Sequence, residues 1–179
     1  MKRLIVLSLA LLAVTAGVAS AGSVGVGVFA GTSIPVLQDD VAQGTLFGLR
    51  APVKLVPLVT VEPYYASSAL GDKDQDIAGI TYTREGFDET AYGLNALLTM
   101  GGPVQFYPFA GIGSTQLKRT GSDDLSLTTY NFGLGLGISP MPKLTLHIRG
   151  ELQMAVDGEA SRKFANVTAG ASYALFSMP

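Results

Sequence analysis

The stretch LTLHIRGELQMAV, residues 144–156, alternates two kinds of side chain over its whole length. Every second residue from Leu144 to Met154 is apolar, apart from one glycine. The residues between them are Thr, His, Arg, Glu and Gln. Successive side chains of a β-strand point to opposite faces of the sheet. The alternation therefore predicts a strand with one apolar face and one polar face.

The same period of two recurs through the rest of the chain. It is strong in residues 24–31, 130–138 and 164–176, and weaker in residues 44–53, 58–68, 87–99 and 104–118. Together with the first stretch, these segments predict eight strands. Residues 22–179 then provide about 20 residues for each strand and its connection, and a tilted membrane-spanning strand needs about 9–11.

The composition is unusually apolar for a soluble domain. Of 179 residues, 47% are hydrophobic and 15% are charged, whereas a soluble domain typically carries about 25% charged residues. Disorder is excluded, because disordered chains are poor in apolar residues and rich in charge. The formal net charge of −2 and the lack of a Lys/Arg cluster argue against a nucleic-acid binder. The chain has no Cys, so no disulfide stabilises it.

Residues 1–21 have the parts of a secretory signal peptide. Lys2 and Arg3 precede an apolar run that is shorter than the roughly 20 residues a spanning helix needs, and small residues at 19–21 precede Gly22. Cleavage before Gly22 is therefore expected, in preference to a retained anchor. Residues 22–179 are expected to form one domain. An exported apolar chain without a spanning helix is predicted to be either an apolar soluble fold or a membrane β-barrel.

The predicted connections alternate between two kinds. The second, fourth and sixth are short and rich in Pro and Gly, whereas the other four are longer or more polar. This asymmetry is typical of outer-membrane barrels, which have short periplasmic turns and longer extracellular loops. The acidic residues expected in the longer loops are Asp39, Asp40, Asp72, Asp74, Asp76, Asp123, Asp124, Asp157 and Glu159. We also place Glu85, Asp88 and Glu89 in or beside the third loop.

Asp72, Asp74 and Asp76 have the spacing of the first ligands of a calcium-binding loop. The rest of that motif is missing, because Ile77 stands where the loop needs Gly and Thr83 where it needs Glu. We therefore expect a solvated loop and no metal site. Weak binding of divalent cations across several acidic loops is left open.

The polar faces of the strands would line the lumen of a barrel. An eight-stranded barrel is only just wide enough for side chains to fill it. The polar and charged residues expected there are Arg50, Glu62, Asn95, His147, Arg149 and Glu151. The positive charges of the two Arg and the negative charges of the two Glu cancel, and a low-dielectric interior favours such compensation. A hairpin centred on Val56 predicts Arg50 directly opposite Glu62, and the acid that meets Arg149 is left open.

Several stretches make the chain similar to the small eight-stranded outer-membrane barrels, the OmpA-like, OmpX-like and porin-family proteins. They are FYPFAGIG at 106–113, FGLGLGI at 132–138, LTLHIRGE at 144–151, and a last strand with Tyr173 and Phe176. The resemblance covers residues 22–179 and implies an all-β fold, an eight-stranded antiparallel up-and-down transmembrane β-barrel in the outer membrane of a Gram-negative cell envelope. It implies no cofactor, a monomer, and contact with outer-membrane lipid, lipopolysaccharide and the barrel-assembly machinery.

The favoured function is non-enzymatic, with a structural or surface-interaction role for the acidic extracellular loops. His147 is the only histidine, and a catalytic role would also need a nucleophile and an orienting acid beside it. We interpret it as part of the lumen filling. The main alternative is a narrow channel for ions or small solutes. A lipid A-modifying enzyme and a soluble periplasmic lipid-binding barrel are less favoured, and the latter would need its apolar faces inside.

Overall fold

The computed structural model describes residues 22–36, 41–77, 79–119, 124–157 and 160–177. Its strands are β1 (Ser23–Val36), β2 (Gly44–Arg50), β3 (Val53–Val56), β4 (Val59–Leu70), β5 (Lys73–Ile77), β6 (Ile80–Arg84), β7 (Phe87–Leu98), β8 (Met100–Gly101), β9 (Val104–Lys118), β10 (Leu125–Met141), β11 (Leu144–Asp157) and β12 (Ala160–Ser177). Among these residues, no helix is long and apolar enough to cross a membrane. The leader predicted at residues 1–21 lies outside the described residues.

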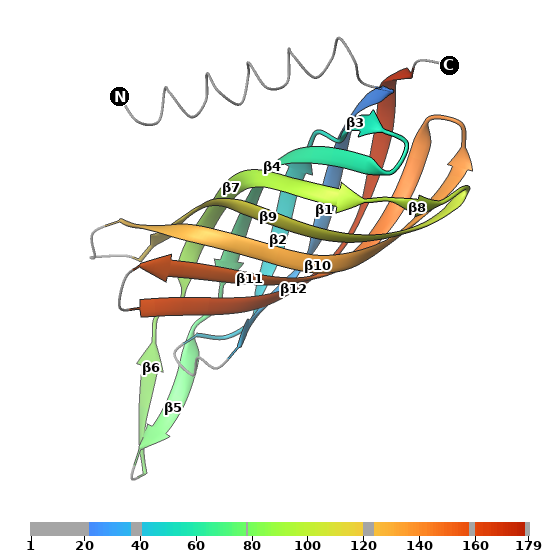
Figure 1. Ribbon diagram of the computed structural model, residues 1–179. Coiled ribbons are helices and arrows are strands. Elements are labelled where there is room, and N and C mark those ends of the chain that lie inside the picture. The colour runs from blue at the N-terminus through green and yellow to red at the C-terminus, as the bar shows by residue number, and fades with distance from the viewer. Residues whose placement is uncertain (1–21, 37–40, 78, 120–123, 158–159, 178–179) are drawn as a thin grey trace.

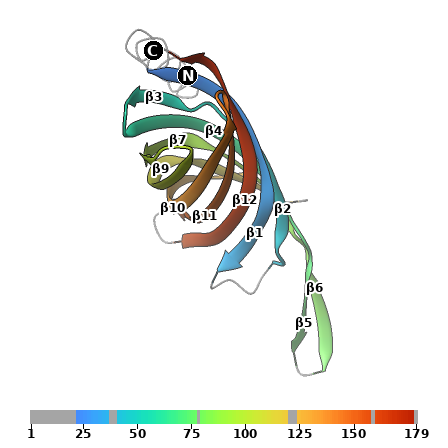
Figure 2. The ribbon, with the colours of Figure 1, turned by 90° about the vertical axis from the view of Figure 1, so that its right-hand side faces the viewer.

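Ten of these strands form one closed antiparallel barrel (Figures 1 and 2). β3 continues β2 after residues 51–52, and β8 continues β7 after residue 99, so the ten strands make eight walls. Each wall pairs with its neighbours along the chain, and β1 closes the barrel by pairing with β12 from Ser23↔Ser177 to Val36↔Lys163. The predicted all-β fold, an eight-stranded antiparallel up-and-down barrel, is confirmed.

The two ends of the barrel differ as the connections predict. Residues 57–58, 102–103 and 142–143 make tight turns at one end, which we call the short-turn end. The start of β1 and the end of β12 lie there too, because they pair with each other. β1, β4, β9 and β11 end at the opposite end, which we call the loop end (Figure 1).

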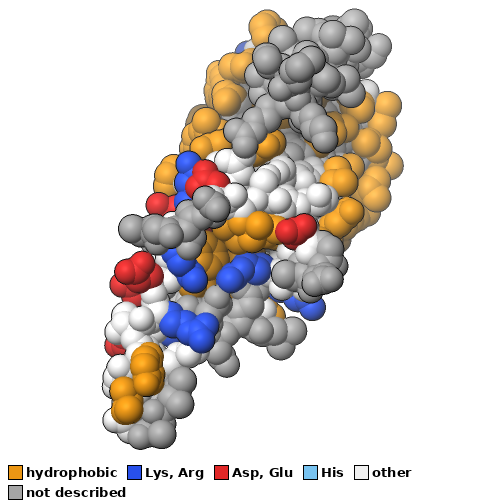
Figure 3. Space-filling model, turned by 90° about the vertical axis from the view of Figure 1, so that its left-hand side faces the viewer, with side chains coloured by type: hydrophobic (Ala, Val, Ile, Leu, Met, Phe, Trp, Pro, Cys, Tyr) orange, Lys and Arg blue, Asp and Glu red, His pale blue; other side chains and the backbone are white. Residues whose placement is uncertain are grey.

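The outer face of the wall is apolar. From Tyr130 to Ile138 along β10 the exposed positions are those predicted to be apolar, including Leu134 and Leu136, while the residues between them are buried or half-buried. Ile148 on β11 exposes 63% of its surface. Figure 3 shows hydrophobic side chains over much of the wall and charged ones gathered towards the loop end. Water would solvate such a wall poorly, whereas a bilayer would cover it. A soluble barrel that binds lipid inside requires the reverse arrangement.

Several glycines of the inner face make room for large rings. A Cβ atom at Gly135 of β10 would collide with the ring of Tyr107, which lies across from it on β9. A Cβ at Gly48 would collide in the same way with the ring of Phe29. The runs of Gly in this sequence therefore have a steric cause, which is the narrow lumen of an eight-stranded barrel.

The third connection, between β4 and β7, contains a hairpin, whereas the sequence predicts only a loop there. β5 and β6 pair with each other and with no strand of the barrel. The hairpin projects beyond the loop end, away from the wall (Figures 1 and 2). Gly79, with φ of 81°, supplies the left-handed residue of its turn. Ile80 and Tyr82 of β6 are each more than half exposed.

Candidate functional site

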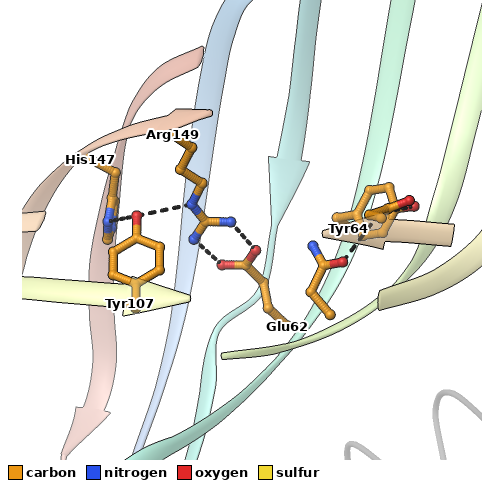
Figure 4. A network of polar contacts seen from close by, with 7 residues as sticks. Glu62, Tyr64, Tyr107, His147 and Arg149 are labelled. Atoms are coloured by element: carbon orange, nitrogen blue, oxygen red, sulfur yellow. Dashed lines mark hydrogen bonds and ion pairs between the residues drawn. The ribbon is translucent and has the colours of Figure 1, made fainter. Parts of the chain in front are cut away.

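The centre of the lumen is crossed by one ion pair. Arg149 on β11 and Glu62 on β4 come from walls that face each other across the barrel. The two guanidinium nitrogens Nη1 and Nη2 donate to the two carboxylate oxygens at 2.5 and 2.8 Å (Figure 4). Arg149 is 6% exposed and Glu62 is 1% exposed. Such bidentate pairs are strong and directional, and they compensate two charges that would be costly to bury singly.

Aromatic side chains extend this pair towards β9 and the only histidine. Arg149 Nε donates to the Tyr107 hydroxyl at 3.0 Å, and that hydroxyl lies 3.0 Å from His147 Nδ1 (Figure 4). The guanidinium also lies 5.0 and 5.3 Å from the ring centroids of Tyr107 and Phe109. Cation–π contacts of this kind help to hold an arginine away from water. The structure therefore brings His147, Arg149 and Glu62 together in one network.

Arg50 lies on the lumen face, but its predicted cross-strand neighbour is wrong. Arg50 pairs in register with Tyr64, and Glu62 pairs with Asn95. The cause is the position of the turn, which lies at residues 57–58 and not at a loop centred on Val56. The Arg50 guanidinium lies 4.4 Å from the ring centroid of Phe29.

Asn95 takes part in a second link across the lumen. Asn131 Nδ2 on β10 donates to the Tyr64 hydroxyl at 2.8 Å and to Asn95 Oδ1 at 3.2 Å. Glu151, the last member of the predicted cluster, accepts from Asn166 Nδ2 at 3.3 Å. A cavity of about 30 Å³ lies between these groups and Arg50, which is room enough for a water molecule.

Glu89 belongs to the lumen, whereas the sequence predicts it in or beside the third loop. It is 3% exposed, and it accepts hydrogen bonds from Ser68 Oγ at 2.9 Å and from Gln153 Nε2. The signal was present, because Glu89 is two residues before Ala91 and shares its face of β7. The count of two Arg and two Glu therefore leaves out a third buried carboxyl group, that of Glu89.

The loop end of the lumen is filled by an apolar plug. We use this name for the buried cluster of Val41, Leu70, Phe87, Leu117, Leu127, Ala155 and Phe164. The Phe87 and Phe164 rings meet edge to face, with centroids 6.4 Å apart. The guanidinium groups of Arg119 and Arg162 lie 5.8 and 5.0 Å from the Phe87 centroid. Polar layers and this plug therefore follow one another along the barrel axis.

The acidic loop residues do not form one cluster in the described part of the chain. Asp72 accepts from the backbone N–H of Gly86, Asp74 from Thr83 and Asp76 from Gly79, at 2.6–3.0 Å. These bonds shape the β5–β6 hairpin. Asp124 lies 3.6 Å from Lys118, both exposed, and Asp157 ends β11 in an exposed position.

Within the described residues, no group of three or more His, Cys, Asp or Glu side chains is placed to hold a metal ion. Asp39, Asp40, Asp123 and Glu159 lie outside the described residues.

A closed barrel of eight antiparallel walls, apolar outside and polar inside, defines the class of outer-membrane β-barrels. A sequence model of the family described as outer membrane protein beta-barrel domain matches residues 4–174. The chain belongs to this family. No protein among the curated sequences compared with it matches significantly.

Solved structures show the same fold at low sequence identity. Neisserial surface protein A is 13% identical with a TM-score of 0.67, and the match covers 84% of this chain and 96% of that one. OprG from Pseudomonas aeruginosa is 14% identical with a TM-score of 0.59, covering 88% and 98%. Ail, the attachment invasion locus protein of Yersinia pestis, is 18% identical with a TM-score of 0.52, covering 87% and 99%. At these identities the likeness concerns the fold alone.

Proposed function

We propose that this outer-membrane barrel is a non-enzymatic protein with a closed lumen, and that its loop end has a structural or surface-interaction role. The observation that carries the proposal is the Arg149–Glu62 pair, which joins opposite walls across the lumen. An ion path would have to pass this pair, the layer around Glu89 and the apolar plug in turn. Every one of these layers is held by several contacts, so the lumen is filled along most of its length.

The surface that remains for function is at the loop end. The β5–β6 hairpin carries Asp74 and Asp76 on one face, and Ile80 and Tyr82 expose apolar area near its tip. A projecting hairpin with free strand edges and exposed apolar side chains is suited to contact another molecule. Ail, one of the similar structures, is described as an attachment invasion locus protein. Lipopolysaccharide, outer-membrane lipid and the barrel-assembly machinery remain our proposed partners for a monomeric chain.

Conductance across a planar lipid bilayer tests the closed lumen. We expect no stable unitary steps from the folded wild-type protein. Unitary steps that change size when Arg149 is replaced by Ala would instead support a narrow channel, because they would show that ions pass this residue. A matched control is Lys118→Ala, which alters an exposed cation outside the lumen and is expected to leave the record unchanged.

The lack of catalysis has its own test in the same preparation. His147 Nδ1 is engaged by the Tyr107 hydroxyl, and no other side chain is hydrogen-bonded to that nitrogen in the described residues. Folded protein incubated with labelled lipid A is expected to release no acyl chains. Release that is lost in a His147→Gln variant would overturn the non-enzymatic assignment.

The proposed export step predicts the mass of the mature chain. If residues 1–21 are a cleaved signal peptide, the protein extracted from the outer-membrane fraction begins at Gly22. Intact-mass spectrometry of that protein checks the prediction directly. A mass that includes residues 1–21 would show that the segment is retained.

A further inference from the structure

A second, larger cavity lies in the lumen at the short-turn end. Its volume is about 190 Å³, and residues of β1, β4, β9, β11 and β12 contribute to its walls. Glu62, Tyr107, His147 and Arg149, whose network is drawn in Figure 4, line its inner end, which we call its floor. We call this cavity the short-turn vestibule. For scale, an engineered apolar cavity of about 150 Å³ admits benzene.

The described residues that line the vestibule carry an excess of positive charge. Lys54 of β3 and Lys143 of the turn before β11 stand at the short-turn end of the cavity, and Arg149 lies at its floor. Glu62 is the only carboxylate among the lining residues, and both of its oxygens accept from Arg149. The two lysines therefore face a cavity whose one acid is already engaged.

Polar atoms without partners also face this cavity. Ser172 is 8% exposed, and its hydroxyl oxygen is buried without a hydrogen-bond partner. His147 Nε2 is also buried without a hydrogen-bond partner, while the other ring nitrogen, Nδ1, contacts the Tyr107 hydroxyl. Both residues line the vestibule. Leaving a buried polar group without a hydrogen bond is unfavourable, so an occupant with oxygen atoms would stabilise both groups.

We propose that the short-turn vestibule binds a small oxyanion, a phosphate or carboxylate group that enters from the aqueous side at the short-turn end. Lysines bind such groups as point charges, and a histidine N–H and a serine hydroxyl can donate to the same oxygens. The cavity is large enough for inorganic phosphate or a small organic acid. The phosphate can come from a free solute or from the headgroup of a phospholipid, and the two sources share this chemistry.

The single histidine gives a direct test. The full mature chain, folded in a phosphate-free maltoside detergent and labelled with ¹⁵N only in histidine, yields one pair of imidazole signals, from His147. Inorganic phosphate and malonate are titrated separately at constant pH and ionic strength. We expect a saturable shift of the His147 signals. A Lys54→Met/Lys143→Met variant is expected to weaken binding at least about tenfold, since each hydrogen bond to a charged group contributes about 1.5–3 kcal/mol.

The matched control keeps the change in net charge and moves it away from the vestibule. Lys118→Met/Lys163→Met removes two lysines at the loop end and is expected to bind as the wild type does. A short-chain phosphatidylglycerol forms the second arm. A shift with free phosphate supports a solute site, and a shift with the lipid alone supports a headgroup site. No saturable shift with any of these probes, or equal binding by both double variants, would overturn the proposal.

Discussion

At the scale of single residues, the lumen shows how far alternation alone can be carried. Alternation placed Arg50, Glu62 and Arg149 on the inner face, and all three are buried there. It could not choose between the acids for Arg149, because β4 and β11 face each other through space and share no hairpin whose turn fixes a register. Glu89 was missed for another reason. Its charge and the long polar connection before it indicate a loop, whereas its position two residues before Ala91 indicates the inner face of β7.

The buried pair predicts an asymmetric response to mutation. Glu62→Ala leaves the Arg149 guanidinium buried without its carboxylate, and we expect it to lower the free energy of unfolding by about 3–5 kcal/mol. Glu62→Leu/Arg149→Met removes both charges at similar volume and is expected to cost less than Glu62→Ala does. Urea unfolding of the folded barrel in detergent micelles measures both values.

The exposed pair of Asp124 and Lys118 serves as the control for this comparison. Asp124→Ala is expected to change the free energy of unfolding by no more than about 1 kcal/mol, because solvent screens an exposed pair. An effect of Glu62→Ala as small as that of Asp124→Ala would contradict the assignment of a buried, compensated pair.

At the scale of elements, the sequence predicts walls better than it predicts their ends. The second wall consists of β2 and β3, interrupted at residues 51–52. The partner of Arg50 on β4 is Tyr64, two residues later than a hairpin centred on Val56 implies. A period of two gives the face of each residue, but it does not show where a strand stops or how a turn is built. The β5–β6 hairpin was hidden for the same reason, because its polar residues resemble those of a loop.

The hairpin is expected to be separable from the barrel. It pairs only with itself, and the Asp72 carboxylate accepts from the Gly86 N–H at 2.7 Å, so its two ends lie close together. Replacing residues 73–84 by a short Gly-rich linker should change the free energy of unfolding by no more than about 1 kcal/mol, as loop length has a weak effect on stability. Heat-modifiable gel mobility together with urea unfolding checks this. Loss of the folded band in the variant would show that the hairpin is needed to form the barrel.

At the scale of the whole molecule, the composition is explained by the distribution of residues over surfaces. Apolar side chains cover the outer wall, glycines give room to rings in a narrow lumen, and charges occupy the lumen layers and the loop end (Figure 3). Sequence alone predicted this architecture because a barrel repeats one simple pattern eight times. The order of the lumen layers depends on which walls face each other, and only the closed structure shows that.

We propose that the barrel crosses the outer membrane with its loop end outside and its short-turn end in the periplasm, because outer-membrane barrels have longer extracellular loops and short periplasmic turns. The chain has no Cys, so a single introduced thiol is a unique label. Thr81→Cys lies in the exposed hairpin and Gly102→Cys in an exposed short turn. In this orientation we expect a membrane-impermeant maleimide to label Thr81→Cys in intact cells, and to label Gly102→Cys only after the outer membrane is permeabilised. Labelling of both sites only after permeabilisation, or of Gly102→Cys alone in intact cells, would contradict it.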